Sequence, residues 1–179
     1  MTIEKALLEA LHYETKIRDL YLSAAGDARE GAAAEFFRRL GEDERRHADF
    51  IDAKLAEFRK TGAVGFEKLG SSLPAAEAFE KALKKTSAAL AGGEAASKAA
   101  AERGPLGGTI EALQHALAAE ESTSSMYREL AGTLSGPAEE IFARFLELEE
   151  GHLRIVRAEL DLATSTGYWF DFKEFDQEG

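Results

Sequence analysis

The 179-residue chain contains no cysteine. This excludes disulfide bonds, thiolate zinc sites and cysteine-held iron–sulfur or rubredoxin-type iron centres, so any bound metal must be held by oxygen and nitrogen atoms. Positive charge is also scarce, because 22 Lys and Arg face 33 Asp and Glu and the formal net charge is -11. Nucleic acids and anionic membranes both require a basic face, so we expect neither as a partner. The binding partners that remain possible are small molecules, metal ions and other proteins.

Long apolar runs are missing as well. No segment approaches the roughly 20 apolar residues that a membrane span needs, and residues 1–16 are charged and amphipathic rather than signal-like. The sequence therefore predicts a cytoplasmic protein. Only three prolines occur, and the strong helix formers Ala, Leu, Glu, Lys and Arg dominate between them. We expect an all-α fold that forms a single domain over residues 1–179.

Caps and breaks predict a first helical hairpin over residues 2–61. Thr2 offers an N-cap, Gly26 and Asp27 offer a break after about residue 25, and Gly62 offers a C-terminal stop. Two antiparallel helices should result, each long enough for a bundle.

A second hairpin is predicted over residues 109–163. Thr109 follows two glycines and offers an N-cap, and residues 132–136 form a turn. Pro137 suits the first position of the last helix, which we expect to end near residue 163.

Two segments lie outside the hairpins. The crossover, residues 62–108, is too long for a simple turn, and its portion 74–90 has helical spacing of apolar residues. The tail, residues 164–179, places Tyr168, Trp169, Phe170, Phe172 and Phe175 among acidic residues. These aromatics could cover one end of the bundle or form a subunit contact.

The two hairpins are internal copies of one another. The first and third helices repeat one spacing of apolar residues, glutamate and tyrosine: Ala6, Leu7, Ala10, Leu11, Glu14, Tyr21 and Ala112, Leu113, Ala116, Leu117, Glu120, Tyr127. The second and fourth helices repeat another: Phe37, Leu40, Glu44, His47 and Phe142, Phe145, Glu149, His152. The glutamates and both Glu-x-x-His pairs therefore recur at nearly one displacement along the chain.

Helical geometry places these acids and imidazoles on inward faces. Residues three or four apart share a face, so each glutamate and histidine lies in or beside an apolar stripe. Four buried carboxylates would be very costly without compensating charge, and two divalent ions would cancel them. The predicted metal ligands are Glu14, Glu44, His47, Glu120, Glu149 and His152.

Carboxylate and imidazole ligation without sulfur suits iron first, with manganese or zinc as substitutes. Neighbouring residues could support the site. Tyr21 and Tyr127 are symmetrically placed to reach ligating glutamates, although a buried tyrosine also commonly serves only the core. Asp43 could orient a ligating imidazole or be a solvated acid. His12 and His115 should face away from the metals.

Over all four bundle helices the chain resembles a rubrerythrin-type member of the ferritin-like di-iron carboxylate superfamily. The resemblance implies a ferritin-like four-helix bundle with a helical crossover, two iron ions, Glu44 and Glu149 as bridging carboxylates, and Tyr21 and Tyr127 beside the ligands. The Asp43-Glu44-x-Arg46-His47 string also resembles one used by di-iron carboxylate proteins. Two features differ: Thr123 stands where rubrerythrins have an added carboxylate ligand, and the cysteine-ligated rubredoxin-like domain is missing.

The resemblance implies a di-iron oxidoreductase that reacts with hydrogen peroxide or dioxygen in the response to oxidative stress. Without cysteine, its electrons must come from an external donor protein or from Fe(II). We expect a homodimer for this enzyme. One alternative is a ferroxidase-type iron oxidation and storage protein, which requires a large hollow shell. A further alternative is a non-catalytic metal-binding bundle.

Overall fold

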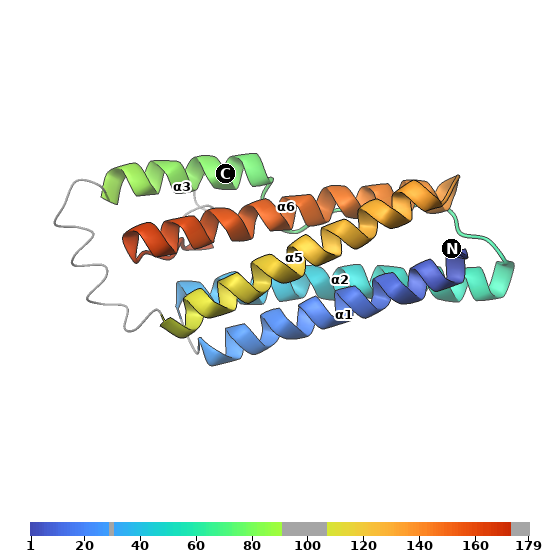
Figure 1. Cartoon of the computed structure of the whole chain (residues 1–179), viewed down its shortest axis with the longest axis horizontal. Coiled ribbons are helices and arrows are strands. Elements are labelled where there is room, and N and C mark those ends of the chain that lie inside the picture. Colours follow the sequence, from blue (N-terminus) through green and yellow to red (C-terminus); the bar gives the residue numbers. More distant parts are fainter. Residues whose placement is uncertain (29–30, 91–106, 173–179) are drawn as a thin grey trace.

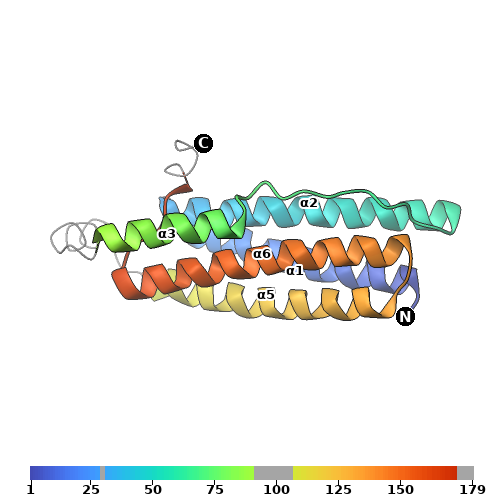
Figure 2. The same cartoon turned by 90° about the horizontal axis from the view of Figure 1, so that it is seen from above.

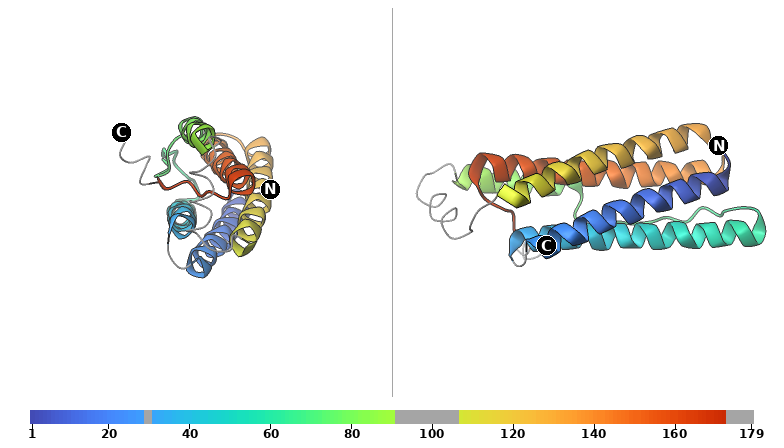
Figure 3. Two further views of the ribbon diagram at one scale, coloured as in Figure 1. Left: turned by 90° about the vertical axis from the view of Figure 1, so that its left-hand side faces the viewer. Right: turned by 60° about the horizontal axis from the view of Figure 1, so that its bottom comes forward.

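The chain forms two helical hairpins packed side by side. The structure, a computed structural model, describes residues 1–28, 31–90 and 107–172. Within these residues there is no strand, and the helices are α1 (Ile3–Asp27), α2 (Ala32–Thr61), α3 (Ala76–Leu90), α5 (Gly107–Thr133) and α6 (Pro137–Thr166). Helix α1 packs against α2 and α5, and α5 packs against α6 (Figure 1). Seen from its end, the bundle has these four helices at its corners, with α3 outside against α6 (Figure 3). The all-α prediction is confirmed.

Several helix ends follow the predicted capping signals. The Thr2 hydroxyl accepts a hydrogen bond from the Lys5 N–H at 3.3 Å, which satisfies one of the free N–H groups of the first turn. Helix α2 ends at Gly62, whose φ of 78° lies in the left-handed region that glycine adopts without strain. Helix α6 begins at Pro137, as predicted.

Other predicted ends are wrong by a few residues. Helix α1 continues through Gly26 to Asp27, because Gly26 does not adopt the positive φ that ends a helix. Helix α5 begins at Gly107, so Thr109 lies in its first turn and is not its N-cap. Helix α6 continues past residue 163 to Thr166, where Gly167 with a φ of 68° supplies the left-handed C-cap.

The crossover contains the predicted helix. After α2, residues 62–75 run back along that helix before α3 begins (Figure 2). Helix α3 then packs on α6, where the Arg154 guanidinium donates to Glu80 at 2.8 Å. Crossover residues 91–106 lie outside the described residues.

The described tail packs into the bundle end. Trp169, Phe170 and Phe172 are each at most 2% exposed. The Phe36 ring of α2 lies 5.8 Å from both Trp169 and Phe172, measured between ring centroids. Of the two predicted roles for the aromatics, these three residues show the covering of a bundle end, whereas Phe175 lies outside the described residues.

A polar layer divides the core in two. One apolar cluster includes Ile17 and Leu40, and the other includes Ala10 and Ile51. Along α1, Glu14 lies between Ala10 and Ile17, and the other helices have the same order of apolar, polar and apolar turns. The helix pattern therefore brings the polar side chains to one level.

Replacing Phe172 tests whether the tail stabilises the fold. We expect Phe172→Ala to lower the free energy of unfolding by about 3 kcal/mol, because a buried aromatic ring is lost and leaves a cavity. Phe66→Ala is the matched control, since this ring is 48% exposed, and its effect should be no more than about 0.5 kcal/mol. Denaturant titration monitored by circular dichroism measures both, and equal effects would contradict the packing role of the tail.

Candidate metal centre

Six polar side chains meet in the layer that separates the two apolar clusters. Glu14 comes from α1, Glu44 and His47 from α2, Glu120 from α5, and Glu149 and His152 from α6. Each is at most 1% exposed. The structure thus places all six predicted ligand residues in the interior at mid-bundle.

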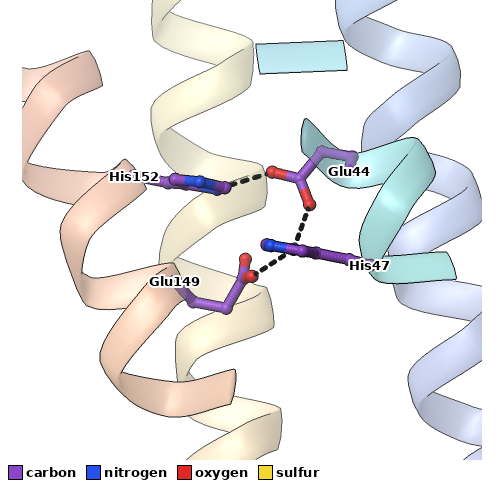
Figure 4. Close-up of side chains that lie close together, drawn as sticks. All are labelled: Glu44, His47, Glu149 and His152. Atoms are coloured by element: carbon purple, nitrogen blue, oxygen red, sulfur yellow. Dashed lines mark hydrogen bonds and ion pairs between the residues drawn. The ribbon is translucent and has the colours of Figure 1, made fainter. Parts of the chain in front are cut away.

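The four residues from α2 and α6 form the closest group (Figure 4). Each of Glu44, His47, Glu149 and His152 offers one ligand atom, and these atoms all lie within 4.8 Å of one another, so the group could hold a metal ion. The two oxygens of Glu44 face different imidazoles, at 2.7 Å from His152 Nδ1 and 3.0 Å from His47 Nδ1. The imidazole rings are parallel within 6°, with centroids 5.3 Å apart.

The glutamates of α1 and α5 are joined to the opposite helix by tyrosines. The Tyr21 hydroxyl of α1 donates to Glu120 on α5, and the Tyr127 hydroxyl of α5 donates to Glu14 on α1. Glu14 also places its Oε2 3.4 Å from His47 Nδ1. Both tyrosines are fully buried, so this reciprocal pair links the two hairpins beside the site.

Asp43 connects the site to the crossover. Its buried carboxylate lies 3.0 Å from His152 Nε2 and also accepts from the Ser71 hydroxyl at 2.5 Å. The backbone N–H and the hydroxyl of Ser72 donate to it at 2.9 and 2.8 Å, and the Arg46 guanidinium donates to it as well. Asp43 is therefore a buried hydrogen-bond acceptor and not a solvated acid.

Burial dominates the ionisation of three of the glutamates. It raises the pKa of Glu14 and of Glu120, and the nearby Glu149 charge raises both further. Burial and the charge of Glu44 raise the pKa of Glu149. Without added positive charge, these carboxyls therefore retain their protons at pH values well above those at which a glutamate ordinarily ionises.

The pKa values of Glu44 and of the two histidines shift in the directions that favour a charged carboxylate and charged imidazoles. Burial alone would raise the pKa of Glu44, but His152 and His47 outweigh it and lower that pKa. Burial alone would lower the pKa of His152, but Glu44 outweighs it and raises that pKa to about 9. The pKa of His47 is raised in the same way. Positive charge in this layer is held by protons on the imidazoles.

The unsatisfied oxygens of this layer fit cations. Glu14 Oε2, Glu120 Oε2 and both oxygens of Glu149 are buried and accept no hydrogen bond. Such atoms carry a desolvation cost that a coordinated ion would remove. Two divalent ions match the four carboxylates in charge, and the donor set of oxygen and imidazole nitrogen suits iron or manganese.

The remaining candidates lie on the surface. His12 and His115 are exposed, as their angular position on the helices predicts, and so are Glu121 and Glu150 beside the proposed ligands. The sequence did not predict that Ser71 and Ser72 are partners of Asp43. No local signal marks them, because their contact with α2 depends on the path of the crossover.

A comparison with protein families finds a match over more than half of the chain. The family model described as Rubrerythrin matches residues 5–103, which include α2, α3 and all but the first two residues of α1. The ligand candidates on α5 and α6 lie beyond the matched residues. A search of curated proteins and a search of solved structures each find no match.

The raised histidine pKa predicts how pH affects the metal-free protein. Because the folded chain holds a proton on His152 more tightly than the unfolded chain, this proton stabilises the fold fully below about pH 6.5, and the contribution disappears as the pH rises through about 9. The raised carboxyl pKa values act in the same direction. We expect the unfolding free energy to fall by a few kcal/mol between these pH values, as measured by denaturant titration after chelation.

Matched histidine variants identify which group causes this dependence of the unfolding free energy on pH. His152→Gln should flatten it, whereas His115→Gln, at an exposed position, should leave it unchanged. Loading with zinc should also abolish the loss, because metal binding favours deprotonated ligands. Stability that is flat or rises over this range in the metal-free protein would contradict the assignment.

Proposed function

The chain belongs to the rubrerythrin family, and on this premise we propose that it is a di-iron oxidoreductase. Its substrate would be hydrogen peroxide or dioxygen, and its electrons would come from an external donor. The observation that carries this proposal is the buried layer of four carboxylates and two imidazoles at mid-bundle.

The proposed ligands form two equivalent halves. The bridging carboxylates would be Glu44 and Glu149, and Glu44 already directs one oxygen to each imidazole. Glu14 and Glu120 would be terminal ligands, one from each hairpin. An iron pair at this position would supply two electrons by cycling between ferrous and ferric states.

The surrounding side chains would fix the orientation of the ligands. A hydrogen bond from His152 Nε2–H to Asp43 leaves Nδ1 directed at the centre. Tyr21 and Tyr127 each donate to one oxygen of a glutamate, which leaves the other oxygen for the metal. Burial, followed by the adjacent carboxylates, raises the pKa of both hydroxyls, so both stay protonated and act as hydrogen-bond donors.

The composition supports the proposal of an external electron donor. The chain has no cysteine with which to hold a rubredoxin-type iron. Thr123, at the position of the added carboxylate in rubrerythrins, instead donates its hydroxyl to the Ala119 carbonyl of its own helix at 3.0 Å. The centre would therefore use six protein ligands, with a separate protein or Fe(II) as the source of electrons.

Metal content and reactivity test the proposal directly. We expect about two iron ions per chain after anaerobic loading, and fast oxidation of the ferrous protein by peroxide in stopped-flow absorbance. Glu149→Gln should lose at least one ion because it removes a bridging carboxylate, whereas Glu150→Gln, at the exposed neighbouring position, should retain both. A ferrous protein that persists in peroxide would overturn the redox assignment, and a large hollow shell that retains excess iron would indicate storage instead.

A second test concerns Asp43. Asp43→Asn should weaken metal binding about 10- to 100-fold, because the His152 ring loses the charged acceptor that fixes its orientation. Asp49→Asn, an exposed position on the same helix, is the matched control and should have no effect. Competition with a chromophoric chelator measures both dissociation constants. Equal affinities for the two variants would reject the positioning role of Asp43.

A further inference from the structure

A solvent-open cavity lies beside the buried centre. It has a volume of about 580 Å³ and lies between α6 and residues 70–77 of the crossover and α3. His152 forms part of its wall, and the other five proposed ligands do not. Of the six proposed ligands, His152 is therefore the one that borders this cavity.

Gly151 lines this cavity next to His152. A glycine in the middle of a helix is unfavourable, because it loses more conformational freedom than alanine on folding. Its φ is not positive, and a Cβ added at this position would meet no heavy atom within 4 Å. Neither backbone conformation nor close packing therefore accounts for the glycine.

Gly41 shows what a packing requirement looks like in the same bundle. A Cβ at Gly41 would lie 2.9 Å from Leu22 Cδ2 and 3.3 Å from Tyr21 Cβ, so the approach of α1 to α2 explains that glycine. No such neighbour exists at Gly151. The cavity lining next to His152 therefore carries no side chain at position 151.

The charged groups of the cavity rim are paired. Glu147 accepts from Arg144 at 2.7 Å, and Glu77 accepts from Arg154. Glu150 accepts from an arginine of α5 at 2.8 Å. Every carboxylate of the rim therefore has a guanidinium partner, which makes the rim polar without strong attraction for ions of either sign.

The far wall is the loop that also fixes the imidazole. Ser71 lines the cavity and donates to Asp43, which in turn bonds to His152. The same hydrogen bonds thus link the cavity wall to the orientation of the His152 imidazole.

We propose that this cavity is the route by which a small neutral hydrogen-bonding molecule, of the size of hydrogen peroxide, reaches the centre at its His152 edge. Gly151, which adds no side chain to the cavity, keeps this route open. The proposal rests on the proposed function for its substrate, but the route itself can be tested without turnover.

The first test follows solvent at the imidazole. In the wild-type chain, loaded with redox-silent zinc or metal-free, cross-relaxation by NMR between water and the His152 ring C–H protons should be observed. Gly151→Leu should abolish it by placing an isobutyl group in the cavity. Gly132→Leu is the matched control, because Gly132 is an exposed helical glycine whose Cβ would also meet nothing, and it should retain the signal.

The second test measures passage. Gly151→Leu should slow the second-order oxidation of the ferrous protein by peroxide about tenfold, with Gly151→Ala between it and the wild type and Gly132→Leu unchanged. Cobalt(II) uptake by the metal-free protein should be slowed far less, because the balanced rim does not favour cations.

The outcomes distinguish a failure of the proposed route from a failure of the proposed function. An unchanged water signal and peroxide rate in Gly151→Leu would overturn the route, and an equal slowing of cobalt uptake would overturn its assignment to neutral molecules. If the wild type bound no metal, the proposed function would fail, while the water signal of the metal-free chain would still decide the route.

Discussion

The concentration of negative charge in one buried layer is the constraint on which this structure depends. Carboxylates from all four bundle helices lie at one level, with apolar clusters on both sides. Ionised carboxylates without partners are not tolerated in such surroundings, so their charge must be balanced by protons or by cations. Protons on the imidazoles and the carboxyls balance it in the metal-free chain, and the same side chains have the donor set that two divalent ions require.

The internal duplication makes the site nearly symmetrical. Tyr21 bonds across to Glu120 and Tyr127 bonds across to Glu14, so each hairpin completes the environment of the other. The symmetry ends at Asp43, because the matching position on α6 is Leu148. Only one half of the centre therefore has a buried acid behind an imidazole.

The crossover and the tail add contacts that the duplicated hairpins do not make themselves. The Glu159 carboxylate accepts the Phe170 N–H at 3.0 Å and thereby holds the aromatic tail against the core. In the crossover, Ser71 donates to Asp43 and lines the cavity that His152 borders. The crossover thus forms the cavity beside His152, whereas the hairpins position the six proposed ligands.

The sequence by itself determined the helices, their pairing into hairpins and the residues that face inward. These follow from short-range periodicity: Glu14 lies in an apolar stripe, so burial of the stripe also buries its carboxylate. Helix ends were less certain, as Gly26 shows, because a glycine ends a helix only when packing lets it adopt a positive φ. Only the tertiary structure decided that Ser71 reaches Asp43 and that Gly151 borders a cavity. Both depend on the path of a long connection across the surface of the bundle, and no local pattern encodes that path.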